Sequence, residues 1–308
     1  MLRIVFAGDA TAGGPILRRI AGLPGAKLAG LALAAGSAPP AGYAGPLLDL
    51  ANLGRAEAAT ELASLAPDLF MNFNSTVVFP GSVLQASGLA VNFHPGPLPA
   101  YAGSFVYQWG IINGEREFGA SIHVMEERVD AGDVLAEARF PLGPEDTGLT
   151  VYMRALNAGV DLLGNLVEDL AAGRTPARRP QDLAQRRFYP NKPPLGGTVN
   201  FGWRAAEVAD FVRALSYRPF ASPSGPPVTY LGQRPLELVK ARAEDQEATG
   251  PLPGEVLEIA AEGILVQAGR GRVRITTLHD GRVAMPAADT ARALGIRPGT
   301  RLGAAPRA

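Results

Sequence analysis

A short apolar run enters a rigid, proline-rich loop at Leu89-Ala90-Val91-Asn92-Phe93-His94-Pro95-Gly96-Pro97-Leu98-Pro99. The apolar part is typical of a strand buried on both faces of a parallel sheet, and the carboxyl end of such a strand is where open α/β sheets build their sites. Asn92 and His94 are two residues apart, so in extended backbone their side chains point to the same side. An amide donor and an imidazole would then converge on one point at the edge of a sheet.

Similar apolar runs, bounded by Gly, Pro and Asp, alternate with helical stretches around this segment. Their order predicts an open α/β sheet over residues 1–175. The clearest helix spans residues 149–170, where apolar side chains recur at alternating steps of four and three. The other expected elements are strands at residues 3–7, 28–33, 68–72, 89–93, 121–125 and 134–140, and helices at residues 15–20 and 56–65.

Periodicity is lost between Arg174 and Gly197, where Pro, Arg and Gln are frequent, and we expect a domain linker there. The sequence therefore predicts one domain at residues 1–190 and a second at residues 198–308. The second domain is expected to be a small β-barrel, with an amphipathic helix at residues 205–215 and strands at residues 254–259, 264–268 and 273–278.

The composition disfavours several classes of protein. With 29 Lys and Arg against 29 Asp and Glu, the chain has no net charge to hold a polyanion, which disfavours generic nucleic-acid binding. Cysteine is absent, so disulfides, thiolate nucleophiles and Cys-ligated metals are excluded. The apolar run after Met1 turns polar at Asp9 and is too short for a secretory signal or a membrane span. We therefore expect a cytoplasmic protein without membrane contact.

Three histidines are candidates for chemistry, and each has a structural alternative. His94 is either part of a site or a hydrogen-bonded structural residue at a strand end. A carboxylate beside it, such as Asp130, would fix its tautomer and raise its pKa, which favours a base that works near neutrality. Asp130 before Ala-Gly is also ordinary turn chemistry. His123 either takes a direct role or packs beside Met125, and His279 is expected in a hairpin turn.

Nucleotide and metal sites are not expected. The turn Gly8-Asp9-Ala10-Thr11-Ala12-Gly13-Gly14 lacks the G-x-G-x-x-G spacing of a dinucleotide site and the Lys of a P-loop, so we expect a plain strand-to-helix turn. The histidines have no carboxylate at ligand spacing and no H-E-x-x-H motif, so no metal is expected.

Several motifs recur in a fixed order along the chain. The run from Asn92 to Gly103 is followed by the turn Asp130-Ala131-Gly132-Asp133, which begins 36 residues after His94. Together these motifs resemble the 10-formyltetrahydrofolate-dependent formyltransferases over nearly the whole chain. The other matching pieces are Gln108-Trp109, Asn113-Gly114-Glu115, Gly119, His123-Val124-Met125, Phe211-Val212-Arg213-Ala214, Pro253-Gly254-Glu255-Val256 and Arg297-Pro298-Gly299.

This resemblance implies a Rossmann-like formyltransferase domain followed by a C-terminal OB-like β-barrel, with 10-formyltetrahydrofolate as co-substrate. It implies that Asn92, His94 and Asp130 form a catalytic trio for acyl transfer without a covalent enzyme intermediate. It also implies folate contacts, which are Thr76, Val77 and Val78, the loop Glu126, Glu127, Arg128, Val129 and Asp130, and Ser104.

The acceptor is expected to be a small or carrier-bound primary amine: an amino sugar, an amino acid or a peptidyl amine. The form Asn-Phe-His-Pro-Gly-Pro-Leu-Pro resembles members with such acceptors and departs from the Ser-Leu-Leu-Pro form of the methionyl-tRNA enzymes. Arg55 is the only Lys or Arg between Lys27 and Arg116, although a tRNA enzyme is expected to carry a basic loop near residues 34–50.

Three alternatives use the same residues. Arginine clusters at residues 174–187 and 270–274 leave methionyl-tRNA open as the acceptor. A hydrolase that releases formate from the same folate would use water as the nucleophile. A folate-binding protein without catalysis is disfavoured, because all three trio positions carry competent side chains.

Overall fold

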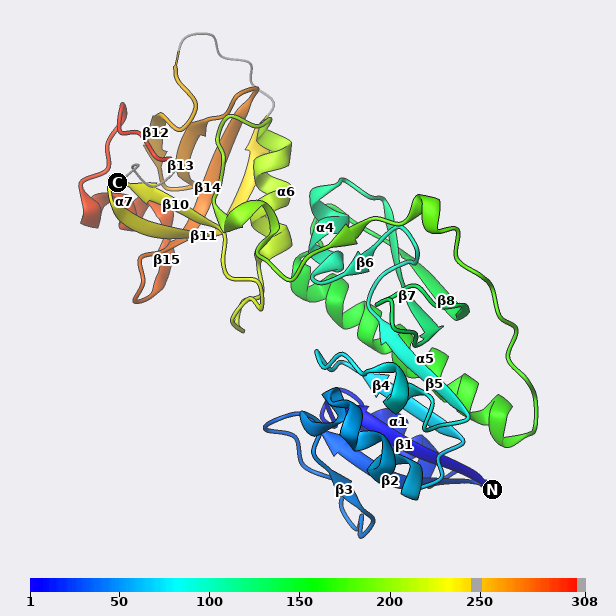
Figure 1. The fold of residues 1–308 in the computed structure, drawn as a ribbon. Coiled ribbons are helices and arrows are strands. Elements are labelled where there is room, and N and C mark those ends of the chain that lie inside the picture. The colour runs from blue at the N-terminus through cyan, green and yellow to red at the C-terminus, as the bar shows by residue number, and fades with distance from the viewer. Residues whose placement is uncertain (245–250, 304–308) are drawn as a thin grey trace. The chain divides into compact units, whose positions relative to one another are not determined.

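The chain folds into two units in the computed structural model, which describes residues 1–244 and 251–303 (Figure 1). These units interleave along the chain, and the consecutive domains expected at residues 1–190 and 198–308 stay a prediction. The first unit comprises Met1–Val106, Glu117–Phe140 and Met153–Pro190, and the second comprises Tyr107–Arg116, Pro141–Tyr152 and Asn191–Ala308.

A seven-stranded sheet forms the centre of the first unit, in the order β3-β2-β1-β4-β5-β7-β8. The strands from β3 to β5 are parallel, and β7 runs antiparallel to β5. The expected Rossmann-like α/β sheet is therefore confirmed. The strand bounds are β1 Leu2–Gly8, β2 Ala26–Leu33, β3 Leu47–Leu48, β4 Leu69–Phe73, β5 Leu89–His94, β7 Glu117–Val124 and β8 Val134–Pro141.

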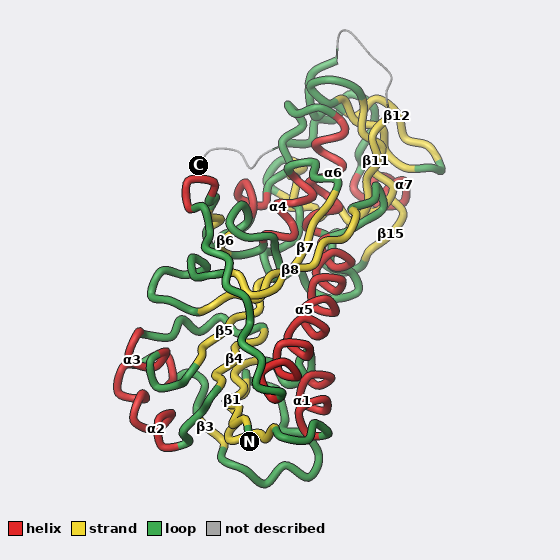
Figure 2. The backbone as a smooth tube through the Cα atoms, turned by 90° about the vertical axis from the view of Figure 1, so that its right-hand side faces the viewer, coloured by secondary structure: helices red, strands yellow, loops and turns green. Residues whose placement is uncertain are grey.

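Helices cover both faces of this sheet, with α2 and α3 on one side and α1 and α5 on the other (Figure 2). On the first side, Leu62 and Val83 belong to the same buried apolar cluster as Phe70 of the sheet. On the second side, Gly159 of α5 lies against the ring of Phe93, 2.3 Å from where a Cβ would stand. The helix bounds are α1 Gly14–Ala21, α2 Ala59–Ser64, α3 Gly81–Leu84 and α5 Gly148–Ala171, with 3-10 turns at Asn52–Gly54 and Ala56–Ala58.

The second unit is built on an antiparallel sheet of six strands. Gly303 pairs with Tyr230 on one outer strand of this sheet, and Arg301 pairs with Glu255, the residue before the other outer strand. The expected C-terminal barrel is confirmed, and His279 and Asp280 lie at the predicted turn between β14 and β15. The bounds are α4 Val106–Ile112, α6 Ala205–Leu215, β10 Val228–Leu231, β11 Arg234–Glu244, β12 Val256–Ala260, β13 Gly263–Gln267, β14 Arg272–His279, β15 Ala284–Pro286 and α7 Ala287–Leu294.

The stretch between Arg174 and Gly197 is more than the expected linker. β6 (Ala102–Gly103) pairs in parallel with β9 (Phe188–Tyr189), so part of this stretch belongs to the first unit. The hydrophobic pattern of the sequence did not indicate this place in the first unit, because the segment has no apolar stripe and is held by a few backbone and side-chain hydrogen bonds. Its two 3-10 turns are Leu183–Gln185 and Pro194–Gly197. None of the helices in the described ranges combines the length and apolar character that a bilayer span requires.

Candidate active site

β5 and the loop after it supply two of the expected site residues. Asn92 is half-buried, while His94 is only 3% exposed. Gly96 allows the loop to fold closely around the His94 ring, since a Cβ at Gly96 would lie 3.1 Å from His94 Nε2. Ser121 on the neighbouring β7 fixes the same loop: its Oγ donates to the Gly96 carbonyl at 2.9 Å and accepts from the Leu98 amide at 3.3 Å. Sequence patterns gave no sign of this role for Ser121.

The turn between β7 and β8 brings Asp130 to the same place. The Asp130 backbone is left-handed, with φ of +53°, and its carboxylate is buried. Asp130 Oδ2 lies 3.6 Å from His94 Nδ1 and accepts a hydrogen bond of 2.8 Å from the Gly103 amide. The imidazole and the carboxylate, 36 residues apart in sequence, thus meet at the carboxyl edge of the sheet.

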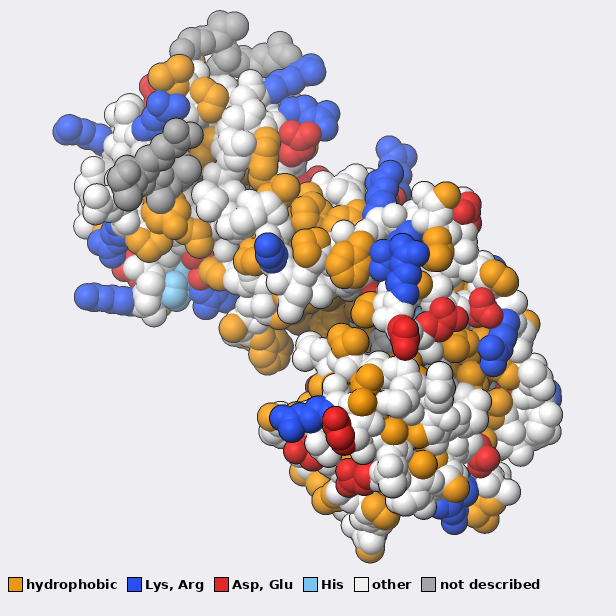
Figure 3. All heavy atoms as spheres, viewed as in Figure 1, with side chains coloured by type: hydrophobic (Ala, Val, Ile, Leu, Met, Phe, Trp, Pro, Cys, Tyr) orange, Lys and Arg blue, Asp and Glu red, His pale blue; other side chains and the backbone are white. Residues whose placement is uncertain are grey.

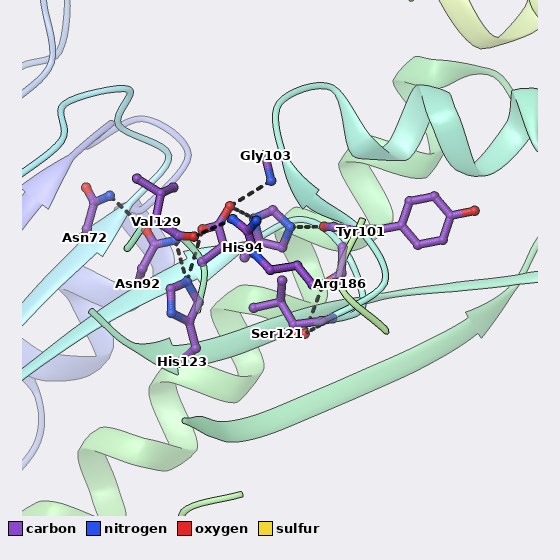
Figure 4. A network of polar contacts seen from close by, with 12 residues as sticks. Asn72, Asn92, His94, Tyr101, Gly103, Ser121, His123, Val129 and Arg186 are labelled. Atoms are coloured by element: carbon purple, nitrogen blue, oxygen red, sulfur yellow. Dashed lines mark hydrogen bonds and ion pairs between the residues drawn. The ribbon is translucent and has the colours of Figure 1, made fainter. Parts of the chain in front are cut away.

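His123 joins this group rather than only packing beside Met125 (Figure 4). Its Nε2 lies 3.0 Å from Asn92 Nδ2 and 3.4 Å from Asp130 Oδ1, and its Nδ1 lies 2.8 Å from the Val124 carbonyl. Pairing of Asn92 with His123 across β5 and β7 explains the contact. We call Asn92, His94, His123 and Asp130 the polar cluster.

Asn72 extends the polar cluster on the adjacent strand β4. Its Nδ2 donates to Asn92 Oδ1 at 2.8 Å, because the two residues are register partners in parallel strands. The Asn92 amide oxygen is therefore occupied, and its amide nitrogen is turned toward His123. An amide nitrogen carries two hydrogens, so Asn92 keeps one donor beyond the bond to His123. The sequence offered no signal for Asn72 beyond its place at the end of a strand.

Burial and hydrogen bonding leave His94 neutral and Asp130 ionised. His94 Nε2 donates to the Tyr101 carbonyl, so a neutral ring has its lone pair on Nδ1, facing Asp130. Burial lowers the pKa of His94, and Asp130 raises it, as expected of a neighbouring carboxylate; the effect of burial is the larger, so the net shift is downward. Burial alone would raise the pKa of Asp130, but His94, His123 and the Gly103 amide hold it well below its usual range. A neutral base thus faces an ionised carboxylate at neutral pH.

The segments expected to hold the pterin lie side by side. Thr76, Val77 and Val78 follow β4 and lead into α3, where the Glu127 side chain stands 2.5 Å from the Cβ position of Gly81. Val78 is 62% exposed and Val129 is 39% exposed. Both segments therefore carry an exposed apolar side chain, and Val129 directly precedes the buried Asp130.

The remaining residues expected to contact folate are exposed or half-buried. Glu126 and Arg128 are exposed on the Asp130 turn, and Ser104 is half-buried, with its amide donating to the Tyr189 carbonyl at 2.8 Å. Within the described residues, no group of three or more His, Cys, Asp or Glu side chains is arranged to hold a metal ion.

Two family models match the chain, Formyl transferase over residues 25–167 and Formyl transferase, C-terminal domain over residues 195–295. Among curated relatives, the methionyl-tRNA formyltransferase of Geobacter sulfurreducens is 30% identical over 262 residues. The aligned region covers 84% of this chain and 80% of that relative.

Solved structures share the fold at lower sequence identity. One of them is HypX from Aquifex aeolicus in complex with tetrahydrofolic acid, with a TM-score of 0.64 and 22% sequence identity. The match covers 96% of this chain but only 47% of HypX. An N-formyltransferase from Helicobacter canadensis, solved with folinic acid and dTDP-3-aminofucose, gives a TM-score of 0.64 and 17% identity over 89% of this chain and 99% of that one.

The family resemblance found in the sequence motifs is confirmed by these matches, and with it the expected enzyme class and its folate co-substrate. Formyl transfer is the activity that these findings support. The chain belongs to the formyl transferase family and is a 10-formyltetrahydrofolate-dependent N-formyltransferase.

Proposed function

We propose that Asn92, His94 and Asp130 carry out formyl transfer to a primary amine. The observation that supports this most directly is the meeting of an amide donor, a neutral imidazole and an ionised carboxylate at the carboxyl edge of the sheet. A pair of buried titratable groups whose pKa values are both shifted from their ordinary values is typical of sites of acid–base chemistry.

Asn92 stabilises the charge that develops on the formyl oxygen. 10-Formyltetrahydrofolate supplies the formyl carbon that the acceptor amine attacks. Asn72 occupies Asn92 Oδ1, which leaves the free Nδ2 hydrogen of Asn92 as the donor to the oxyanion. Removing one such donor typically lowers the rate about a hundredfold to a thousandfold.

His94 takes the proton that the attacking amine loses as its nitrogen bonds to the formyl carbon. The protonated ring then returns this proton to the folate nitrogen as the bond between that nitrogen and the formyl carbon breaks, and tetrahydrofolate leaves. Nδ1 is the accepting atom, because Nε2 already donates to the Tyr101 carbonyl. The gap of 3.6 Å between Nδ1 and Asp130 Oδ2 is longer than a hydrogen bond, and a proton on Nδ1 converts it into an ion pair. General base catalysis of this kind contributes roughly a hundredfold to ten-thousandfold.

Folate contacts are proposed for Thr76, Val77 and Val78, for residues 126–130 and for Ser104. The adjacency of these segments and the exposure of Val78 support them. We further propose that residues 1–190 form the catalytic domain and residues 198–308 the OB-like domain, and that the enzyme works in the cytoplasm.

The acceptor is a small or carrier-bound amine in this proposal. The connection from β2 to β3 lies at the carboxyl edge of the sheet, since Ala34 donates to the Gly8 carbonyl and Ser37 donates to Asp9. It contains no Lys or Arg between residues 28 and 54, so it offers no charge to a phosphate backbone there.

Methionyl-tRNA is the second candidate acceptor, and the Geobacter sulfurreducens relative favours it. The arginine clusters give it little support, because three of their side chains, Arg174, Arg179 and Arg274, already pair with carboxylates. Arg174 pairs with Asp169, and Arg274 pairs with Glu244 and Glu258. Figure 3 likewise shows basic and acidic side chains together on both units.

A panel of acceptors with 10-formyltetrahydrofolate tests the proposal. Nucleotide-linked amino sugars, amino acids, aminoacyl and peptidyl carriers and methionyl-tRNA are incubated with the enzyme and with His94→Ala, and mass spectrometry detects products heavier by one formyl group. A formylated small or carrier-bound amine supports the proposal, whereas exclusive formylation of methionyl-tRNA selects the second candidate. Release of formate without an acceptor selects the hydrolase. Folate binding without turnover rejects both formyl transfers and the hydrolase.

A further inference from the structure

A segment that follows α5 lies across the Asp130 turn. Residues 179–189, which we call the strap, begin with Arg179 in an antiparallel bridge to Val134 and end in β9 beside Gly103. The amide of Gly103 is itself bonded to Asp130 Oδ2. The strap therefore connects the two loops that enclose the Asp130 carboxylate.

Gln181 of the strap holds the backbone of the Asp130 turn. Its Nε2 donates to the Asp130 carbonyl at 3.1 Å and to the Gly132 carbonyl at 2.6 Å. Both hydrogens of the amide nitrogen are thus used on one turn. Gln181 Oε1 is buried without a hydrogen-bond partner, so this side chain's hydrogen bonding is directed wholly at the turn.

Arg186 holds the same turn one residue earlier (Figure 4). Its Nη2 donates to the Val129 carbonyl at 2.9 Å, and its guanidinium lies 4.9 Å from the centre of the Phe188 ring. Contact with the aromatic face restricts the guanidinium to one plane. Two strap side chains therefore bond three carbonyls around Asp130.

Asp130 needs such support because its backbone is strained. A φ of +53° is uncommon for a residue with a side chain and persists only where neighbouring contacts enforce it. Relaxation of this backbone would swing the carboxylate away from His94 Nδ1 and the Gly103 amide, which it now meets at 3.6 and 2.8 Å.

The geometry points to Gln181 and Arg186 as positioning residues that aim the Asp130 carboxylate at His94. The inference rests on the proposed role of Asp130 in formyl transfer. Neither side chain contacts the His94 ring or Asn92 in the hydrogen bonds above, so both act through the turn.

Gln181→Met tests this role, because Met keeps the length of the side chain and removes both donated hydrogen bonds. We expect kcat to fall about tenfold to a hundredfold, as for a displaced catalytic group, with the acceptor KM unchanged. Gln185→Met is the matched control, since Gln185 lies on the same strap, is exposed and bonds Asp182. Its kcat should equal that of the wild type.

The same substitution is then made in an Asp130→Ala background. A residue that only aims the carboxylate has nothing to aim there, so Gln181→Met should cost no further rate. Equal losses in both backgrounds, or a wild-type kcat for Gln181→Met, would overturn the inference. If Asp130→Ala itself keeps wild-type activity, the proposed function fails instead, which keeps the two failures distinct.

Arg186 gives an independent pair of variants if Gln181→Met does not fold. Arg186→Met removes the donor to Val129, whereas Arg186→Lys keeps a cationic donor of similar length. We expect kcat to fall in the Met variant and to recover at least in part in the Lys variant. Equal kcat values in Arg186→Met and the wild type would contradict the inference.

Discussion

At the carboxyl edge of the sheet, His94, His123 and Asp130 are each 7% exposed or less, and in the barrel Arg274 is almost as buried, at 8%. The two places differ in how the buried charge is met. Arg274 donates from its guanidinium to Glu244 and to Glu258 on other strands of the barrel. Asp130 instead accepts from the Gly103 amide at 2.8 Å, lies 3.4 Å from His123 Nε2, and faces His94 Nδ1 at 3.6 Å, beyond hydrogen-bond distance.

This difference separates a structural use of charge from a chemical one. Hydrogen bonds to Glu244 raise the pKa of Arg274 and lower that of Glu244, so both stay charged and paired, and their contribution is to stability. In the polar cluster, burial keeps His94 neutral beside an ionised Asp130, so His94 Nδ1 can accept a proton. Substitutions in the polar cluster should therefore change the rate, and substitutions at Arg274 should change stability.

His94→Ala is expected to show the largest effect on rate. Loss of the proton acceptor should lower kcat by roughly a hundredfold to ten-thousandfold. Release of tetrahydrofolate in the presence of the acceptor measures the rate. Two controls, binding of reduced folate and the circular dichroism spectrum, show whether the variant is folded. A near-normal kcat in a folded His94→Ala enzyme would remove the proposed mechanism.

Gly96→Ala should lower kcat by a smaller factor, about tenfold to a hundredfold. An added Cβ would stand 2.8 Å from Val106 Cγ2 and 3.1 Å from both His94 Nε2 and the Tyr101 carbonyl, so the ring must shift away from its partners. Gly303→Ala is the control, because no atom lies within 4 Å of the Cβ position there. Equal rates in the two variants would show that the ring tolerates displacement.

The pH profile of kcat/KM should reflect the lowered pKa of His94. The base works when neutral, so the rate is constant at high pH and falls as the pH drops through this pKa, below the ordinary value of 6.5. Asp130→Asn removes the charge that raises the pKa of His94, so the acidic limb should move to still lower pH. A limb that moves to higher pH in this variant would contradict the assignment of His94 as the base.

Most of the sheet and part of the site could be predicted from the sequence, because both depend on local pattern. β5 ends one residue beyond the expected strand, and the two-residue spacing brings Asn92 and His94 into one network. α5 spans one residue more at each end than its apolar stripe. Buried strands and amphipathic helices have a hydrophobic pattern that extends over many residues, so they can be predicted from the sequence.

The rest of the site depends on the path of the folded chain. Gln181 and Arg186 bond backbone carbonyls that lie 51 and 57 residues away, and a carbonyl has no side-chain identity to recognise in sequence. The net fall in the pKa of His94 could not be predicted, because the spacing of His94 and Asp130 in the sequence indicates a nearby charge but not the depth of burial. Burial depends on Gly96, Ser121 and Tyr101 closing the loop over the ring.

Arg274→Met should leave the rate of formyl transfer unchanged and lower the free energy of unfolding by about 1.5–3 kcal/mol, the range for hydrogen bonds to charged groups. Met fills much of the same volume, so the loss reflects the donors to Glu244 and Glu258. Arg292→Met is the control: Arg292 is exposed and pairs with Asp289 three residues away, which is worth about 0.5 kcal/mol or less. Urea unfolding measures both. A lower rate in a fully folded Arg274→Met enzyme would mean that the buried charges of the barrel also contribute to catalysis. The distinction between stabilising charges in the barrel and catalytic groups in the polar cluster would then be wrong.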